Sequence, residues 1–130
     1  MLEIARFLLP DAPERVAPFS HAVRAGGLLF VTGQMPTLPG GGHRMVEGGI
    51  EAQTRQVIAN LKTVLAGCGA EWERTVFARV YLTEFGRDYA AMNAIWESSF
   101  PSGGLPGRTC VGVTALAVGA LVEIDLVVAF

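Results

Sequence analysis

The residues best suited to chemistry lie near the C-terminus, where charged side chains interrupt two apolar segments. Arg108 and Cys110 belong to PGRTC, while Glu123 and Asp125 alternate with aliphatic residues in LVEIDLVVAF. Arginine presents a planar fork of donors that matches a carboxylate, and it stays charged at any working pH. A nearby carboxylate can accept a proton from water and act as a general base. Arg108 with Glu123 therefore suits the attack of water on a small organic acid, but the pair could equally form a structural salt bridge, and spacing alone does not decide.

The two segments that carry these residues are predicted to be neighbouring strands of a terminal hairpin. Residues 108–116 and 121–130 are joined by a short connection, and aliphatic side chains alternate along each segment. If both aliphatic sets pack against the helices, the charged residues of both strands and Cys110 project from the other side of the sheet. A face that mixes charged and apolar residues requires a partner, and most soluble oligomers are symmetric homo-oligomers. We therefore expect Arg108 and Glu123 to line a pocket between subunits.

The elements expected to support this pair include two amphipathic helices. Apolar residues recur at three- and four-residue intervals from about 49 to 68 and from about 87 to 100, which is typical of a helix with one buried face. Alternation over 74–83 predicts a strand, as does the apolar run 28–32, and residues 1–10 are interpreted as an edge strand. This order predicts a two-layer α+β domain with both helices on one face of a mixed sheet.

The composition favours one globular domain and gives no sign of a nucleic-acid or membrane partner. The chain has 130 residues, 51% of them hydrophobic, so residues 1–130 are expected to form a single domain around one core. The net charge is −2 and the ten basic residues are scattered, which provides no attraction for a polyanion. No apolar stretch approaches the roughly 20 residues that span a bilayer, and the N-terminus lacks the features of a secretory leader. We therefore expect a cytoplasmic protein.

The cysteines and histidines are not arranged for a disulfide framework or a metal site. Cys68 and Cys110 are expected to be reduced thiols, because a chain this apolar does not need a covalent staple. Cys110 could be a reactive thiol, but no histidine or basic neighbour other than Arg108 lies near it in sequence, which favours a role for its backbone. His21 and His43 lack the spacing of metal ligands and are expected in surface or loop positions.

Six segments, in the same order, resemble the reactive intermediate deaminase family, also called the RidA or enamine/imine deaminase family. They cover nearly the whole chain: APFSHAV, LLFVTGQMP, IEAQTRQVIANLKTVLAGCGA, VFARVYLTEFGRDYAAMNAIW, PGRTCVGVTAL and LVEIDLVVAF. The resemblance implies a chorismate-mutase-like α+β fold, a homotrimer with a site at each subunit interface, and no metal or organic cofactor. The implied reaction is hydrolysis of an enamine or imine, of the 2-aminoacrylate or 2-iminobutanoate type, to a 2-keto acid and ammonia.

The resemblance also implies roles for individual residues. The arginine of the P-x-R motif, Arg108, would hold the substrate carboxylate, and the acid of the last strand, Glu123, would position the hydrolytic water with help from the backbone carbonyl of Cys110. Many active members have a tyrosine where this chain has Phe19, which can wall the pocket but cannot donate a hydrogen bond. Gly107 replaces an alanine common in the motif, so the loop before Arg108 is expected to be more mobile than is typical of the family.

Three further residues are candidates for lining the pocket. Asn93 lies on the apolar stripe of the second predicted helix, where it could line the site, as the resemblance implies, or be a satisfied buried amide. Thr32 and Gly33 lie at the end of a predicted strand beside the expected pocket, and the resemblance makes Gly33 a candidate backbone donor.

Two other functions remain open at the level of sequence. Phe19 and the glycine-rich SGGLPG segment could open the pocket for a longer unsaturated substrate, such as 2-aminomuconate. Alternatively, the protein could be a non-catalytic binder of small carboxylates or a regulatory protein, and some relatives are described as ribonucleases or translation inhibitors. The acidic composition and the lack of a basic, aromatic-rich stripe weigh against RNA.

Overall fold

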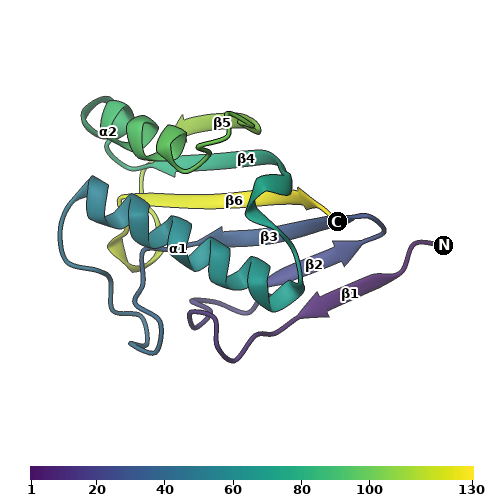
Figure 1. Ribbon diagram of the computed structural model, residues 1–130. Helices are drawn as coiled ribbons and strands as arrows, with labels where there is room; N and C mark the ends of the chain where they lie inside the picture. Colours follow the sequence, from purple (N-terminus) through teal and green to yellow (C-terminus); the bar gives the residue numbers. More distant parts are fainter.

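A six-stranded mixed sheet and two long helices make up the computed structural model, which describes residues 1–130 (Figure 1). The strands are β1 Ile4–Phe7, β2 Ala22–Ala25, β3 Leu28–Gln34, β4 Thr75–Leu82, β5 Gly107–Gly112 and β6 Val122–Ala129. The helices are α1 Ile50–Cys68 and α2 Phe85–Ser98, with short 3-10 turns at Trp72–Arg74 and Ala117–Gly119. The strands lie in the order β1-β2-β3-β6-β4-β5, and every neighbouring pair is antiparallel except β4 and β5.

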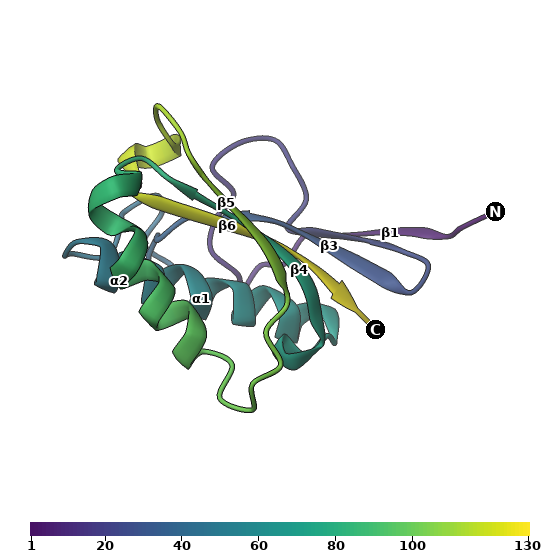
Figure 2. The same ribbon diagram turned by 90° about the horizontal axis from the view of Figure 1, so that it is seen from above.

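Both helices lie on the same face of the sheet, and the opposite face carries no helix (Figures 1 and 2). We call the uncovered side the open face; it is the side on which Glu123 and Asp125 of β6 lie. The segment between β1 and β2 arches over part of that side (Figure 2). The predicted two-layer α+β fold with a mixed sheet is therefore confirmed, and so is the edge position of β1.

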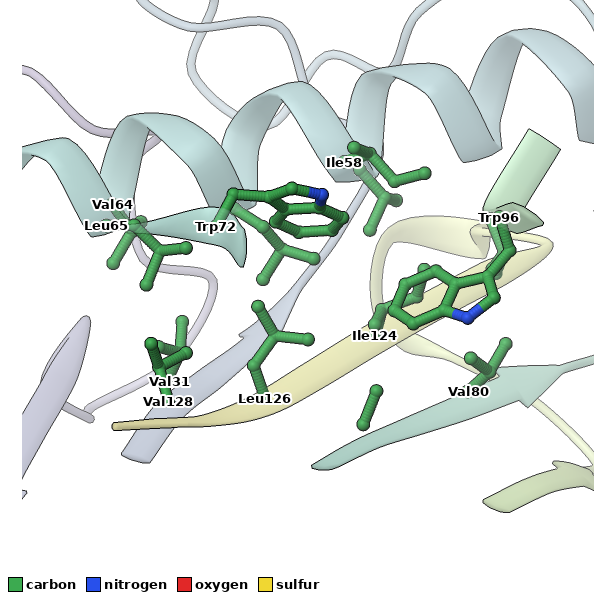
Figure 3. Close-up of a cluster of buried hydrophobic side chains, with 14 of the residues drawn as sticks. Val31, Ile58, Val64, Leu65, Trp72, Val80, Trp96, Ile124, Leu126 and Val128 are labelled. Atoms are coloured by element: carbon green, nitrogen blue, oxygen red, sulfur yellow. The ribbon is translucent and has the colours of Figure 1, made fainter. Parts of the chain in front are cut away.

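The hydrophobic core lies between the helices and the sheet (Figure 3). It forms because every second residue of β6 and β4 meets the apolar stripe of a helix, which is the periodicity that the sequence shows. The side chains labelled in Figure 3 are Val31, Ile58, Val64, Leu65, Trp72, Val80, Trp96, Ile124, Leu126 and Val128. No helix of this core is long and apolar enough to cross a membrane.

The predicted terminal hairpin is wrong, because β4 lies between β5 and β6. Helix α2 connects β4 to β5, and a helical crossover allows two strands to pair in parallel, as these do. The chain then returns past β4, so that β6 pairs with β4 and β3. Alternation along β5 and β6 showed which residues of each strand share a face, but it contained no information about which strand each would pair with.

Smaller differences concern local irregularities. Strand β2 was not predicted, and α2 begins at Phe85 and ends at Ser98, two residues earlier at each end than expected. Regular alternation over residues 74–83 would place Val76 on the same side as the buried Ala78, but a register shift between Thr75 and Phe77 leaves Val76 exposed. A shift of one residue moves a side chain to the other face of a strand. His21 lies in the loop that leads into β2, one of the two kinds of position expected for it, but its side chain is buried.

Asn60 joins α1 to the chain that follows β3. Its side chain is fully buried, and Nδ2 donates to the carbonyls of Met35 at 2.9 Å and Thr37 at 2.8 Å. Its Oδ1 accepts a 2.9 Å bond from Gln56 Nε2. These bonds fix the position of the chain just after Gly33, so Asn60 helps to position this candidate site residue.

Asn60→Ala is expected to lower the free energy of unfolding by about 2–4 kcal/mol, because each buried carbonyl left without a donor costs roughly 1–3 kcal/mol. Urea unfolding at a fixed protein concentration measures the loss. The matched control is Thr63→Ala, since Thr63 lies on the same helix and its hydroxyl donates only to the carbonyl of Ala59. That change should cost less than about 0.5 kcal/mol. Equal losses in the two variants would contradict the role assigned to Asn60.

Candidate functional site

Arg108 lies on β5, at one edge of the sheet, with its side chain turned toward α2. One guanidinium nitrogen, Nη2, donates to Asn93 Oδ1 at 2.7 Å, and Nη1 lies 3.7 Å from the sulfur of Met92. The rings of Tyr89 and Trp96 each lie 6.0 Å from the guanidinium carbon. Aromatic rings at such distances attract a cation, so α2 holds the guanidinium by several contacts in one orientation.

A hollow of about 270 Å³ opens beside this arginine, lined by Asn93, Trp96, Glu97, Leu105, Pro106 and Arg108. No carboxylate forms a salt bridge with Arg108, which leaves the guanidinium with donors to offer an anion. Asn93 is half-buried, and its amide oxygen holds the Arg108 guanidinium. The Arg108 half-site, as we call Arg108, Asn93 and Cys110, is therefore suited to binding a carboxylate.

Cys110 lies two residues along the same strand, half-buried against the core. Burial raises the pKa of its thiol, and the opposing effect of the nearby Arg108 charge is smaller. A thiol whose pKa is raised stays protonated, which disfavours a nucleophilic role. In the parallel pairing of β4 and β5, Val113 N–H bonds Leu82 O. The backbone groups of successive residues in a strand point alternately to its two sides, so those of Cys110, three residues before Val113, point away from β4. They face the free edge of the sheet, where the Cys110 carbonyl can accept a hydrogen bond from water.

Glu123 lies on the open face, next to the end of β3. Pairing between β3 and β6 is interrupted after Val31 and resumes at Gln34, so Thr32 and Gly33 form an irregular stretch beside Glu123. The Glu123 carboxylate lies directly over Gly33, because a Cβ atom at that position would overlap it. Bulges of this kind are frequent next to active sites, where they change the direction of a side chain. Here the missing side chain of Gly33 provides the space that Glu123 occupies.

The carboxyl group of Glu123 holds its proton more tightly than an ordinary glutamate does. Burial raises its pKa above the usual range, and the negative charge of Asp125 adds to the effect. Asp125 itself is engaged, since it accepts from Arg79 Nε at 3.0 Å and from Tyr81 Oη at 3.1 Å. Glu123 has no side-chain hydrogen bond or salt bridge within the chain, so it remains available to a water molecule or a ligand.

Phe19 and Thr32 complete this side. Phe19 lines a narrow pocket whose other residues include Gly33 and Gln34. Thr32 donates its hydroxyl proton to Ser20 O at 2.7 Å, which ties the end of β3 to the segment that carries Phe19. We call the group Phe19, Thr32, Gly33 and Glu123 the Glu123 half-site.

Within one chain the two half-sites lie on opposite faces of the sheet. Arg108 pairs with Ala78 and Glu123 pairs with Tyr81. Ala78 is buried toward the helices, whereas Tyr81 reaches Asp125 on the open face. The expectation that Arg108 and Cys110 share a face with Glu123 and Asp125 is therefore wrong. The side chain of Val111, expected to be buried, is 42% exposed instead.

Some residues of the site were not anticipated from the sequence. The apolar stripe over residues 87–100 was predicted only as a buried helix face, yet it includes Tyr89 and Trp96, whose rings flank Arg108, and Met92, which contacts it. Their spacing on one helical stripe was visible, but nothing in the sequence placed β5 against that stripe. Arg79 and Tyr81, which engage Asp125, gave no signal beyond strand alternation.

Comparison with known proteins places the chain among related sequences over nearly its whole length. A family model described as endoribonuclease L-PSP matches residues 9–130. A RutC family protein of Synechocystis is 41% identical over 117 residues, which cover 90% of this chain and 89% of the relative. Protein DfrA of Myxococcus xanthus is 39% identical over 119 residues, which cover 90% of this chain and 88% of the relative.

Solved structures agree with this relationship. A protein of unknown function of the conserved Rid family from Yersinia pestis superposes with a TM-score of 0.91 at 32% identity, covering 98% of this chain and all of that one. RidA from an Antarctic Psychrobacter species gives a TM-score of 0.88 at 29% identity, covering 97% of this chain and 99% of that one. The fold and both half-sites therefore lie within the region that these proteins share.

Proposed function

The chain belongs to the endoribonuclease L-PSP family, which includes the Rid and RutC proteins, and on this premise we propose that it hydrolyses small 2-imino acids to 2-keto acids and ammonia. Family membership supports a deaminase or small-molecule-binding role in general. The observation that carries the finer proposal is the pair of half-sites, one suited to a carboxylate and the other to activating water. Imines of the 2-iminobutanoate type carry the carboxylate and the electrophilic carbon that such a pair requires, and enamines of the 2-aminoacrylate type acquire that carbon when they tautomerise to the imine.

The working site is proposed to form between two copies of the chain. Arg108 and Glu123 cannot reach one substrate from opposite faces of the same sheet. A second copy that docks its Arg108 edge against the open face of the first would bring the two half-sites together. The open face supports such docking, since the exposed hydrophobic side chains on β3, β4 and β5 include Phe30, Phe77 and Val111. Three copies arranged in a ring would give three equivalent sites, in agreement with the homotrimer that the resemblance implies.

The reaction follows from the chemistry of the groups brought together. Arg108 binds the substrate carboxylate and so fixes the imine carbon opposite Glu123. Ionised Glu123 accepts a proton from water as the water oxygen bonds to the imine carbon, aided by the Cys110 carbonyl. The nitrogen takes up the proton that Glu123 accepted, which gives a carbinolamine with an OH and an NH2 group on one carbon. The nitrogen then gains a second proton as the hydroxyl loses one, the C–N bond breaks, and ammonia leaves behind the ketone of the 2-keto acid. The imine carbon is already electrophilic, so the proposal requires no cofactor.

A coupled assay tests the proposal directly. The purified protein is mixed with threonine and a threonine dehydratase, which releases the enamine and imine of 2-oxobutanoate, and formation of the keto acid is followed. Acceleration over the spontaneous hydrolysis is expected. No acceleration, or equal acceleration by an Arg108→Ala variant, would contradict the proposed function.

Mixing two inactive variants tests whether the site lies between copies. We expect Arg108→Ala and Glu123→Gln proteins to be nearly inactive alone and to recover activity when unfolded together and refolded at equal amounts. If each site takes one half from each of two neighbours in a ring, about a quarter of the sites receive both intact halves. If both halves came from the same chain, no intact site would form and the mixture would stay inactive.

A larger substrate is the second candidate. The hollow beside Arg108 measures about 270 Å³, which is more than the methyl group of the imine form of 2-aminoacrylate occupies. Leu105 and Trp96 form its apolar walls. This supports longer imino or unsaturated amino acids, such as 2-aminomuconate. Comparing kcat/KM across imines of increasing side-chain length distinguishes the candidates, because confinement of activity to the smallest imines would exclude the larger substrate.

A further inference from the structure

The segment that carries Phe19 owes little of its shape to the hydrophobic core. It joins β1 to β2 without a helix or strand of its own. Between Pro10 and Pro18 only Ala12 and Pro13 are buried, and of these only Ala12 belongs to the hydrophobic core. The segment instead curves around an open hollow of about 670 Å³. Hydrogen bonds must therefore fix the conformation of the parts of this segment that do not pack into the core.

His21 supplies two of these hydrogen bonds from inside the fold. Its side chain is only 5% exposed, at the point where the segment enters β2. Nδ1 accepts a 3.0 Å bond from the backbone N–H of Leu9, and Nε2 lies 2.8 Å from the carbonyl oxygen of Pro13. A backbone N–H can only donate and a carbonyl can only accept, so only the neutral ring with its proton on Nε2 satisfies both partners. One imidazole thus joins two separate points of the segment.

The same position is linked to the Glu123 half-site through the backbone. The carbonyl of His21 accepts from Thr32 N at 3.1 Å, and the preceding carbonyl, that of Ser20, accepts from the Thr32 hydroxyl at 2.7 Å. Phe19 is two residues before His21, and it lines the pocket that also contains Gly33. The ring of His21 therefore connects the backbone at Leu9 and Pro13 to the strand on which Thr32 and Gly33 lie.

We propose that His21 is a positioning residue that holds Phe19 in place as the wall of the Glu123 half-site. This inference rests on the proposed function for its effect on turnover. Without the two ring hydrogen bonds, the segment loses its ties at Leu9 and Pro13, and Phe19 no longer occupies one position beside Gly33. Arg108 keeps its contacts with α2, and Glu123 keeps its place on β6 over Gly33. Substrate binding therefore suffers more than the chemical step.

The first experiment compares His21→Leu with His21→Asn. Leucine removes both hydrogen bonds, whereas the Oδ1 of asparagine can take the place of Nδ1 and keep the bond from Leu9. His21→Leu is expected to raise KM about tenfold, as for the loss of one or two net hydrogen bonds, while kcat changes less than about threefold. His21→Asn is expected to restore part of the affinity. Hydrogen exchange of the Leu9 amide should be slow in the wild type and in His21→Asn, and fast in His21→Leu.

A second experiment asks whether His21 acts through Phe19. Phe19→Ala and His21→Leu are each measured alone and together. If His21 only positions Phe19, the double variant should have nearly the KM of Phe19→Ala, rather than the product of both effects. His43→Asn is the control, because His43 also bonds a carbonyl of the segment, Arg15 O, but from an exposed position. It should change neither KM nor the exchange of the Leu9 amide by more than about twofold.

Three results would overturn the inference: fully multiplicative effects in the double variant, unchanged exchange of the Leu9 amide in His21→Leu, or equal effects of His21→Leu and His43→Asn. The amide exchange is independent of turnover. If the wild type neither hydrolyses imines nor binds 2-oxobutanoate, the proposed function fails, and the exchange data alone decide whether His21 holds the segment.

Discussion

Replacing Arg108 by alanine is expected to lower kcat/KM for a small 2-imino acid roughly a thousandfold, because truncating a charged, hydrogen-bonded group that anchors its partner costs about 4 kcal/mol. The loss should be large because α2 already holds the guanidinium through Asn93, Met92, Tyr89 and Trp96. An arginine held in advance loses little freedom when the substrate binds, so its full interaction with the carboxylate is available for binding. Steady-state kinetics in the coupled dehydratase assay measures the change.

Two further variants make the Arg108 result interpretable. Arg108→Lys keeps the charge but not the planar fork, and it should retain an intermediate activity. Arg55→Ala removes an exposed arginine of α1 and should leave kcat/KM within about twofold, because surface changes away from a site have small effects. If Arg108→Ala kept more than about a third of the wild-type kcat/KM, Arg108 would not be the anchor of the substrate.

Replacing Glu123 by glutamine is expected to lower kcat between a hundredfold and ten-thousandfold, roughly the contribution of a positioned general base. The pH dependence gives a second, independent readout. The base must be ionised, so activity should fall as the pH decreases through the pKa of Glu123. Because burial and Asp125 both raise that pKa, the fall should occur above the value of about 4.3 that is usual for glutamate.

The acid at position 125 provides the control for this pH profile. Asp125→Asn removes the negative charge that helps to raise the pKa of Glu123, while the burial of Glu123 remains. The acid limb should therefore move to lower pH in Asp125→Asn and disappear in Glu123→Gln, whose residual rate should be nearly independent of pH. An acid limb that persists unchanged in Glu123→Gln would assign it to another group.

Alternation and helical spacing were sufficient to predict both helices, most of β3, β4, β5 and β6, and the two-layer fold, because each of these elements except β5 has one buried side. Spacing did not predict that β4 lies between β5 and β6, since the pairing of strands depends on tertiary packing of α2 rather than on either strand alone. This error led to a wrong prediction of the site, because Arg108 lies on the helix side of the sheet and Glu123 lies on the open face.

The resemblance to imine deaminases named the residues of both half-sites, which spacing alone could not do. It did not reveal how each residue is supported. The bond from Arg108 to Asn93 and the position of Glu123 over Gly33 depend on contacts between segments far apart in the sequence. His21 was misplaced for a related reason: a histidine in a loop is usually exposed, and nothing local indicated that its ring bridges Leu9 and Pro13.

The separation of Arg108 and Glu123 on opposite faces has a consequence for the concentration at which the protein works. Under the proposed assembly, a chain that has just been released from the ribosome, or one that has dissociated, contains every catalytic group and yet has no working site. Specific activity should then depend on dilution, falling steeply once the total concentration drops below that needed for association. Substrate that bridges two copies would in turn oppose dissociation, so the imine itself would help to hold the enzyme together.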